Sequence, residues 1–281
     1  MSSETPSSET PPPPRRDSRG NRLVDWAAQP TGSGHRLWLR TTADVVAQIR
    51  RAATDYRQVH PPDWYRGTWT HLLDSHVPLR AEIANLLDLL TRALTLPAPR
   101  GMDTVLALDW YKVADDDVDP RSWSNTAAGD WVSRGKYWYR SGPLRQEDAG
   151  RRAAAALAEA VRRHPALSTA TVVADVPGHD ALQVSFGSRL AATVAQQTGR
   201  PFVRVSCTVP FRPEAKSVTD AQHAAVLHGS FRVPEPLRGA RVLVVDDVFR
   251  SGRSMAEVAR ACRAAGAASV SGLCVARTLR N

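Results

Sequence analysis

The chain has 281 residues, of which 42% are hydrophobic, enough for one large or two modest domains with an ordinary core. No stretch approaches the roughly eighteen apolar residues of a membrane span, and the amino terminus lacks a signal-peptide pattern, so we expect a cytoplasmic protein. Cys207, Cys262 and Cys274 have neither C-x-x-C nor zinc-cluster spacing, which predicts buried thiols without a chemical role.

The net charge of +9 is unevenly distributed along the chain. Residues 1–33 carry four Arg and four acids, residues 34–150 carry 15 basic and 15 acidic residues, and residues 151–281 carry 18 and 9. A basic domain attracts anions, so we expect a polyphosphate or a nucleic acid in the last part. Of the 37 cations 34 are Arg, which suits phosphate binding but which codon usage alone can also produce.

Residues 1–33 are rich in Ser, Thr, Pro and Gly and predict a disordered arm. Helical apolar spacing follows at 41–56 and at 79–94. The segments 104–111 and 135–140 predict strands, with a polar loop between them. The acidic side chains of this loop could hold a divalent cation, but their spacing is not that of an EF-hand, and a solvated loop is favoured. They are Asp115, Asp116, Asp117 and Asp119.

All eight tryptophans fall between Trp26 and Trp138. We therefore expect residues 34–148 to form a separate Trp-rich α+β accessory or hood domain, with a boundary near 142–150. The tryptophans could form a platform for stacking bases, but core or interface packing is the favoured interpretation.

Helix and strand alternate regularly in residues 149–281, which predicts a parallel sheet with helices on its faces, an α/β fold. Helices are expected at 151–163, 186–198 and 254–265. Strands are expected at 171–175, 202–205, 230–233, 241–245 and 269–276.

The strand expected at 241–245 is followed directly by Asp246 and Asp247. In open α/β sheets ligands bind beyond the carboxyl ends of the strands, where such carboxylates can accept hydrogen bonds from ribose hydroxyls or orient water on a metal. Gly252 then allows close approach of a phosphate, and the backbone N–H groups that open the next helix favour an anion.

This order of strand, acid pair, glycine turn and helix resembles the PRPP-binding motif of type I phosphoribosyltransferases, an apolar strand followed by Asp-Asp-Val-x-Thr-Thr-Gly-x-Thr. Ser251 and Ser254 replace Thr, and Arg250 stands where the family usually has Thr. Residues 157–278 further resemble the ComF-type, amidophosphoribosyltransferase-like branch, including the closing Val-Ala-Arg-Thr at 275–278. The Cys-rich segment of that group is absent.

The resemblance implies a type I phosphoribosyltransferase core in residues 149–281, with a role for each matching segment. Asp246 and Asp247 would hold the ribose hydroxyls and a metal. The residues implied to bind the 5′-phosphate are Arg250, Ser251, Gly252, Arg253 and Ser254. The turn implied to bind pyrophosphate is Val176, Pro177, Gly178 and His179, although His179 could equally be an exposed loop residue. A loop carrying Arg212 and Lys216 would close over PRPP.

The expected activity is an Mg²⁺-dependent transfer of phosphoribosyl from PRPP to a nitrogen nucleophile, a nucleobase or an amine, with release of pyrophosphate. The alternative is a catalytically inactive PRPP-sensing or nucleic-acid-binding ComF-like protein linked to DNA uptake or regulation, although no RNA- or DNA-binding motif is visible. A third hypothesis is an interaction protein whose Trp-rich half docks a partner. A homodimer also stays open.

Overall fold

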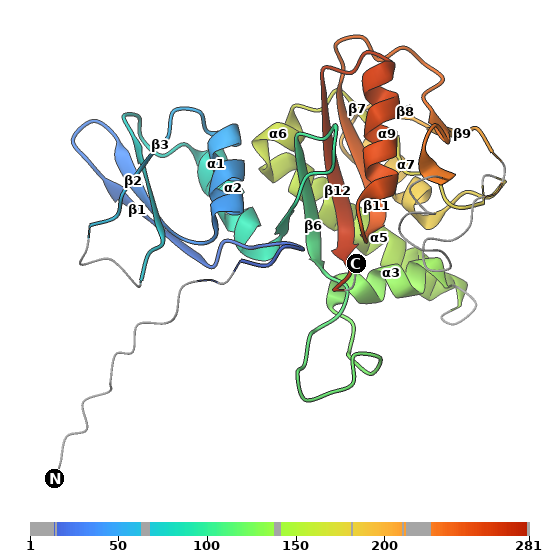
Figure 1. The fold of residues 1–281 in the computed structure, drawn as a ribbon, viewed down its shortest axis with the longest axis horizontal. Helices are drawn as coiled ribbons and strands as arrows, with labels where there is room; N and C mark the ends of the chain where they lie inside the picture. The colour runs from blue at the N-terminus through green and yellow to red at the C-terminus, as the bar shows by residue number, and fades with distance from the viewer. Residues whose placement is uncertain are drawn as a thin grey trace.

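The computed structural model describes residues 14, 16–62, 68–137, 142–180, 182–209, 211 and 226–279. At the amino-terminal side, strands β1 to β4 form an antiparallel sheet in the order β1-β2-β4-β3, and helices α1 and α2 accompany it (Figure 1). These elements are β1 (Asp25–Pro30), β2 (His35–Arg40), α1 (Ala43–Ala52), β3 (Arg57–Val59), β4 (His71–Ser75) and α2 (Ala81–Arg92).

The main sheet follows the order β5-β6-β12-β11-β7-β8, in which β5 is antiparallel to β6 and the other pairings are parallel. Its strands are β5 (Leu94–Leu96), β6 (Thr104–Trp110), β7 (Val172–Asp175), β8 (Phe202–Val203), β11 (Arg241–Phe249) and β12 (Ser269–Arg277). Its helices are α3 (Ala127–Lys136), α5 (Pro143–Arg163), α6 (Pro165–Ser168), α7 (Phe186–Gln197) and α9 (Arg253–Ala264). A separate small ribbon pairs β9 (Ser206–Cys207) with β10 (Phe231–Arg232). The prediction of a mixed α/β fold with parallel strands is confirmed.

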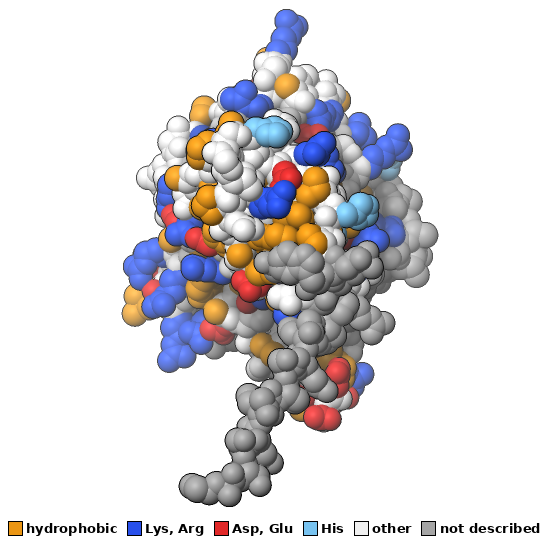
Figure 2. Space-filling model, turned by 90° about the vertical axis from the view of Figure 1, so that its left-hand side faces the viewer, with side chains coloured by type: hydrophobic (Ala, Val, Ile, Leu, Met, Phe, Trp, Pro, Cys, Tyr) orange, Lys and Arg blue, Asp and Glu red, His pale blue; other side chains and the backbone are white. Residues whose placement is uncertain are grey.

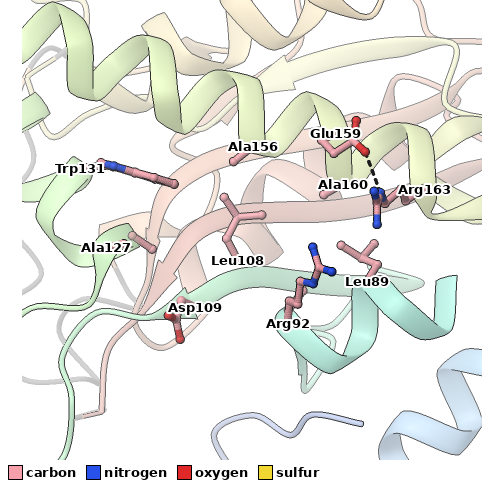
Figure 3. A pocket seen from close by; sticks show the side chains of 12 residues that line it. Leu89, Arg92, Leu108, Asp109, Ala127, Trp131, Ala156, Glu159, Ala160 and Arg163 are labelled. Carbon is pink, nitrogen blue, oxygen red and sulfur yellow. Dashed lines mark hydrogen bonds and ion pairs between the residues drawn. The ribbon is translucent and has the colours of Figure 1, made fainter. Parts of the chain in front are cut away.

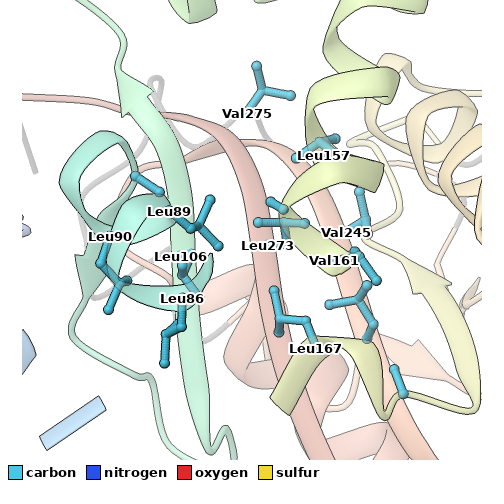
Figure 4. Packing of buried hydrophobic residues seen from close by; sticks show 14 of the residues in the cluster. Leu86, Leu89, Leu90, Leu106, Leu157, Val161, Leu167, Val245, Leu273 and Val275 are labelled. Carbon is cyan, nitrogen blue, oxygen red and sulfur yellow. The ribbon is translucent and has the colours of Figure 1, made fainter. Parts of the chain in front are cut away.

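Both faces of the main sheet are covered, as alternation along its central strand requires. Val242 and Val244 of β11 pack in a cluster with residues of α9, whereas Leu243 and Val245 pack in a second cluster. This second cluster contains residues of α2, α5 and α7, and Figure 4 shows α2 and α5 contributing side chains to it beside the sheet. One continuous core therefore joins the antiparallel lobe to the main sheet.

Four of the described tryptophans pack in or against the core. Trp38 is buried, and Trp26, Trp110 and Trp131 pack against the two core clusters.

The face of the molecule on the side of the antiparallel lobe shows an apolar patch with basic and histidine side chains at its edge (Figure 2). Cys262 and Cys274 are buried free thiols, as expected, whereas Cys207 is only partly buried. Burial raises the pKa of Cys262 to about 12. No helix in the described ranges is both long and apolar enough to cross a membrane.

The strand expected at 135–140 is wrong where the structure describes it, because residues 135 and 136 end helix α3. The hydroxyl of Thr126 caps this helix by accepting a hydrogen bond from the backbone N–H of Gly129 at 3.0 Å. An aromatic run suggested β structure, but the cap and the packing of the helix against α5 decided otherwise. Residues 138–140 lie outside the described part.

The expected domain boundaries also need correction. Strand β6 pairs with β12 in register Leu106↔Leu273, so the main sheet is not confined to residues 149–281. Helix α3 and the first turns of α5 also pack with this sheet. The expected boundary rests on a change of composition along the chain. Parallel pairing joins strands that lie far apart in the sequence, so a sheet can extend across such a boundary. Within the arm expected to be disordered, Asp25–Pro30 forms β1 and Asn21 bridges Thr95, and residues 1–13 and 15 lie outside the described ranges.

Candidate active site

The acid pair lies at the carboxyl end of β11, between two parallel neighbours. The register pairs Val245 with Asp175 of β7 and Asp246 with Cys274 of β12. Asp246 is partly exposed, whereas Asp247 retains only 6% of its surface. The backbone N–H of Asp247 donates to Asp246 Oδ1 at 2.8 Å, which fixes the first carboxylate against the chain. The pair therefore has the position expected for a ligand site in an α/β sheet.

A lysine that the sequence did not predict binds this pair. Nζ of Lys136, at the end of α3, lies 2.8 Å from Oδ1 of Asp247. The Lys136 side chain keeps 36% of its surface and that of Asp247 keeps 8%, so the ion pair is partly buried on the lysine side and buried on the aspartate side. The arrangement places a cation and two carboxylates at the end of one buried strand.

The end of α3 is held in place by close packing against α7. A Cβ on Gly135 would approach ring atoms of Phe186 to between 2.2 and 2.7 Å, so only glycine lets the helix lie on this ring. The carbonyl of Gly135 accepts a hydrogen bond from Gln146 Nε2 at 2.8 Å. Because Lys136 is the residue after Gly135, this contact places its ammonium beside Asp247.

Burial and neighbouring charges shift the pKa values of the groups at the site. Burial, together with the charge of Asp247, raises the pKa of Asp246 well above its ordinary value. Burial opposes the charge of Lys136, but the attraction and hydrogen bond of Asp247 outweigh it, so the pKa of Lys136 is raised and the ammonium stays protonated. Burial also raises the pKa of Tyr111, which is partly buried and follows β6. The site therefore combines one ion pair with a carboxyl group that holds its proton unusually well.

We expect Lys136→Met to lower the free energy of unfolding by about 2 kcal/mol. Removing one partner of a fully buried pair costs about 3–5 kcal/mol, and the partial exposure of the Lys136 side chain reduces this value. Adding Asp247→Asn to Lys136→Met should recover most of the loss, because an amide carries no charge. Urea unfolding of both variants measures the coupling. Lys112→Met is the control, since Lys112 binds the carbonyl of Trp123, and an equal loss there would refute the assignment.

The turn after β11 has the geometry of an anion site. Gly252, at φ +75°, directly precedes α9 and occupies the left-handed region. A Cβ there would also approach the Phe249 ring to 2.5 Å and Pro99 to 2.7 Å. Among the described residues no side chain caps this helix and no acid lies in its first turn, so its N–H groups and dipole favour an anion. The predicted residues Arg250, Ser251, Arg253 and Ser254 are all partly exposed around this turn.

The predicted pyrophosphate turn follows β7, directly beside the acid pair. Val176 is buried, Pro177 and Gly178 are partly exposed and His179 is exposed. The carboxylate of Asp175 accepts a hydrogen bond from the backbone N–H of Val205 at 2.8 Å and is almost fully buried. Burial raises its pKa, although hydrogen bonds from Ser188 and Val205 oppose the shift. Asp175 thus joins the end of β7 to the backbone at Val205 rather than facing a ligand.

The structure brings together the acid pair, residues 250–254 and residues 176–179, whereas Arg212 and Lys216 lie outside the described residues. Sequence analysis missed Lys136 because it expected a strand there. The capping Thr126 and Gly135 were the available signals. The antiparallel lobe lies beyond the β5–β6 edge, so β12 and β6 separate it from β11. Among the described residues of 34–148, Lys136 of α3 binds the acid pair, and Tyr111 after β6 interacts with Asp247.

The acid pair does not by itself make a magnesium site. In the described ranges no three His, Cys, Asp or Glu side chains converge on one point, and Lys136 already binds one oxygen of Asp247. Magnesium usually binds one or two carboxylates together with substrate phosphates. The expected role of Asp246 and Asp247 as metal ligands therefore remains a prediction.

The chain is similar to known proteins in structure but not in sequence. No family model matches it, and no curated protein has a significantly similar sequence. Among solved structures, the crystal structure of a purine phosphoribosyltransferase from Pyrococcus horikoshii Ot3 is similar over 45% of this chain and 70% of its own, with 20% identity and a TM-score of 0.31. Similarity at this level does not establish an activity, so function has to be argued from the site.

Proposed function

We propose that the protein is a phosphoribosyltransferase that binds PRPP and transfers its phosphoribosyl group to a nitrogen nucleophile. The observation that carries the proposal is the acid pair near the carboxyl end of β11. The turn after this strand leads to Gly252 and to the uncapped amino terminus of α9. Carboxylates that could accept hydrogen bonds from two hydroxyls are thus followed, after the end of β11 at Phe249, by N–H groups that favour a phosphate, as the two ends of a ribose 5-phosphate would require.

Each part of the site has a role in this reaction. The acid pair accepts hydrogen bonds from the ribose hydroxyls, the turn at 250–254 binds the 5′-phosphate, and the turn at 176–179 receives pyrophosphate. The bond between ribose C1 and a pyrophosphate oxygen breaks, the oxygen keeps the electron pair, and the nitrogen lone pair forms the new bond to C1. Magnesium bound to the pyrophosphate would neutralise its charge. The acceptor is a nucleobase or an amine.

Lys136 adds a feature to the proposed chemistry. Its ion pair with Asp247 fixes that side chain in the absence of ligand, so the hydroxyl-binding group is already oriented when PRPP arrives. Positioning and charge then supply most of the catalysis.

We expect PRPP with Mg²⁺ to raise the melting temperature, because a ligand that binds only the native state stabilises it by about 2.7 kcal/mol at a hundredfold excess over its dissociation constant. Differential scanning fluorimetry with PRPP, with ribose 5-phosphate and with a duplex DNA oligonucleotide measures this. Pyrophosphate release with a panel of bases and amines then tests turnover. A shift with DNA but not with PRPP would favour the nucleic-acid-binding alternative, and a PRPP shift without turnover would favour the sensor.

A further inference from the structure

A second pocket lies away from the acid pair, where the antiparallel lobe meets the main sheet. It has a volume of about 320 Å³ and is bordered by α2, β6, α3 and α5. Leu89, Leu108 and Ala160 are among the side chains that line it, and Trp131 of α3 lies at one end, with Leu108 between it and the charged end (Figure 3). This volume falls at the lower end of the range for small-molecule sites, and its lining is mainly apolar, as in such sites.

Positive charge gathers at the other end of this pocket. Arg92, in the last turn of α2, and Arg163 of α5 both border it there (Figure 3). The carboxylate of Glu159 pairs with Arg163 at 2.6 Å and with Arg162 at 3.0 Å, so one acid serves two cations. Arg92 has no ion-pair partner in the part of the chain that the structure describes. The other acid of the lining, Asp109, pairs with Arg22.

We propose that this pocket binds a small molecule with a flat apolar ring and one carboxylate. The ring would lie along Leu108 against Trp131, and the carboxylate would accept hydrogen bonds from the guanidinium of Arg92 and balance the excess positive charge there. Charge-assisted hydrogen bonds of this kind are roughly twice as strong as neutral ones. The pocket is independent of the proposed PRPP site, because none of its lining residues belongs to that site.

Naphthalene-2-carboxylate is a suitable probe, with naphthalene-2-methanol as its neutral counterpart, and titration calorimetry of the full chain measures both. We expect the carboxylate to bind, and Arg92→Met to weaken it by about tenfold or more, since one charge-assisted hydrogen bond is lost. Ala156→Leu, which keeps every charge and fills part of the pocket, should weaken both probes. Thermal unfolding of each variant checks that it is folded.

Arg50→Met is the matched control, because Arg50 also lies exposed in the last turn of a lobe helix but outside the pocket, and it should leave binding unchanged. The variant with Asp246→Asn and Asp247→Asn should also keep the probe affinity, which separates this proposal from the proposed function. The proposal is overturned if the wild type does not bind the carboxylate at millimolar concentration, if the alcohol binds equally well, or if the two arginine variants behave alike.

Discussion

Replacing both carboxylates, Asp246→Asn with Asp247→Asn, is expected to weaken PRPP binding by at least about a hundredfold while the chain stays folded. Each carboxylate that accepts a hydroxyl hydrogen bond contributes roughly 1.5–3 kcal/mol, and two such losses correspond to a hundredfold or more. In the variant, the amide oxygen at position 247 can still accept a hydrogen bond from Lys136, whose side chain is partly exposed. The fold should therefore tolerate the change better than binding does.

Titration calorimetry with PRPP and Mg²⁺ measures this loss, and circular dichroism checks the fold. Asp116→Asn with Asp117→Asn is the control, since these acids are also adjacent but lie exposed in the loop after β6. Equal PRPP affinity in the folded acid-pair variant and in the wild type would refute the site. Equal losses in the site variant and the loop control would show that net charge, rather than this acid pair, attracts PRPP.

The second large effect is a loss of stability in mild acid that depends on His164. This residue joins α5 to α6, keeps 1% of its surface and accepts a hydrogen bond at Nε2 from the side-chain amide of Gln48 of α1 at 2.9 Å. Burial lowers the pKa of His164 from 6.5 to about 4. Because its Nδ1 lacks a partner among the described residues, a protonated ring would have a buried, uncompensated charge.

The sign of the effect follows from the two pKa values. Between pH 6.5 and about 4 the unfolded chain binds a proton at His164 and the folded chain does not, so acid favours unfolding. The stabilisation is complete above pH 6.5 and declines as the pH falls to about 4, by a total of about 3 kcal/mol. Other groups titrate in the same window, so the contribution of His164 has to be measured as a difference.

Urea unfolding of the wild type and of His164→Gln at pH 7 and pH 4 gives this difference. The variant should lose about 3 kcal/mol less than the wild type on acidification, whatever its stability at pH 7. His228→Gln, at an exposed position, should retain the acid sensitivity of the wild type. An equally steep decline in His164→Gln would show that His164 does not control it.

Local patterns predicted much of the main sheet. The apolar run at 241–245 is the first part of β11, which continues through the acid pair to Phe249, and the helices expected at 186–198 and 254–265 are α7 and α9 within one residue at each end. These predictions succeeded because alternation along a strand and the apolar stripe of a helix depend on neighbouring residues. The short strands β2 to β5 were not predicted, since segments of three to six residues carry little periodic signal.

The sequence by itself determined the order of acid pair, glycine turn and helix, because these residues are adjacent and their geometry follows from one strand end and one positive φ at Gly252. Only the tertiary structure decided that β6 joins the parallel sheet, that Lys136 reaches Asp247 and that Gln48 meets His164. In each case the partners lie far apart in the chain. Their meeting depends on how sheet and helices pack around a shared core, which no local pattern records.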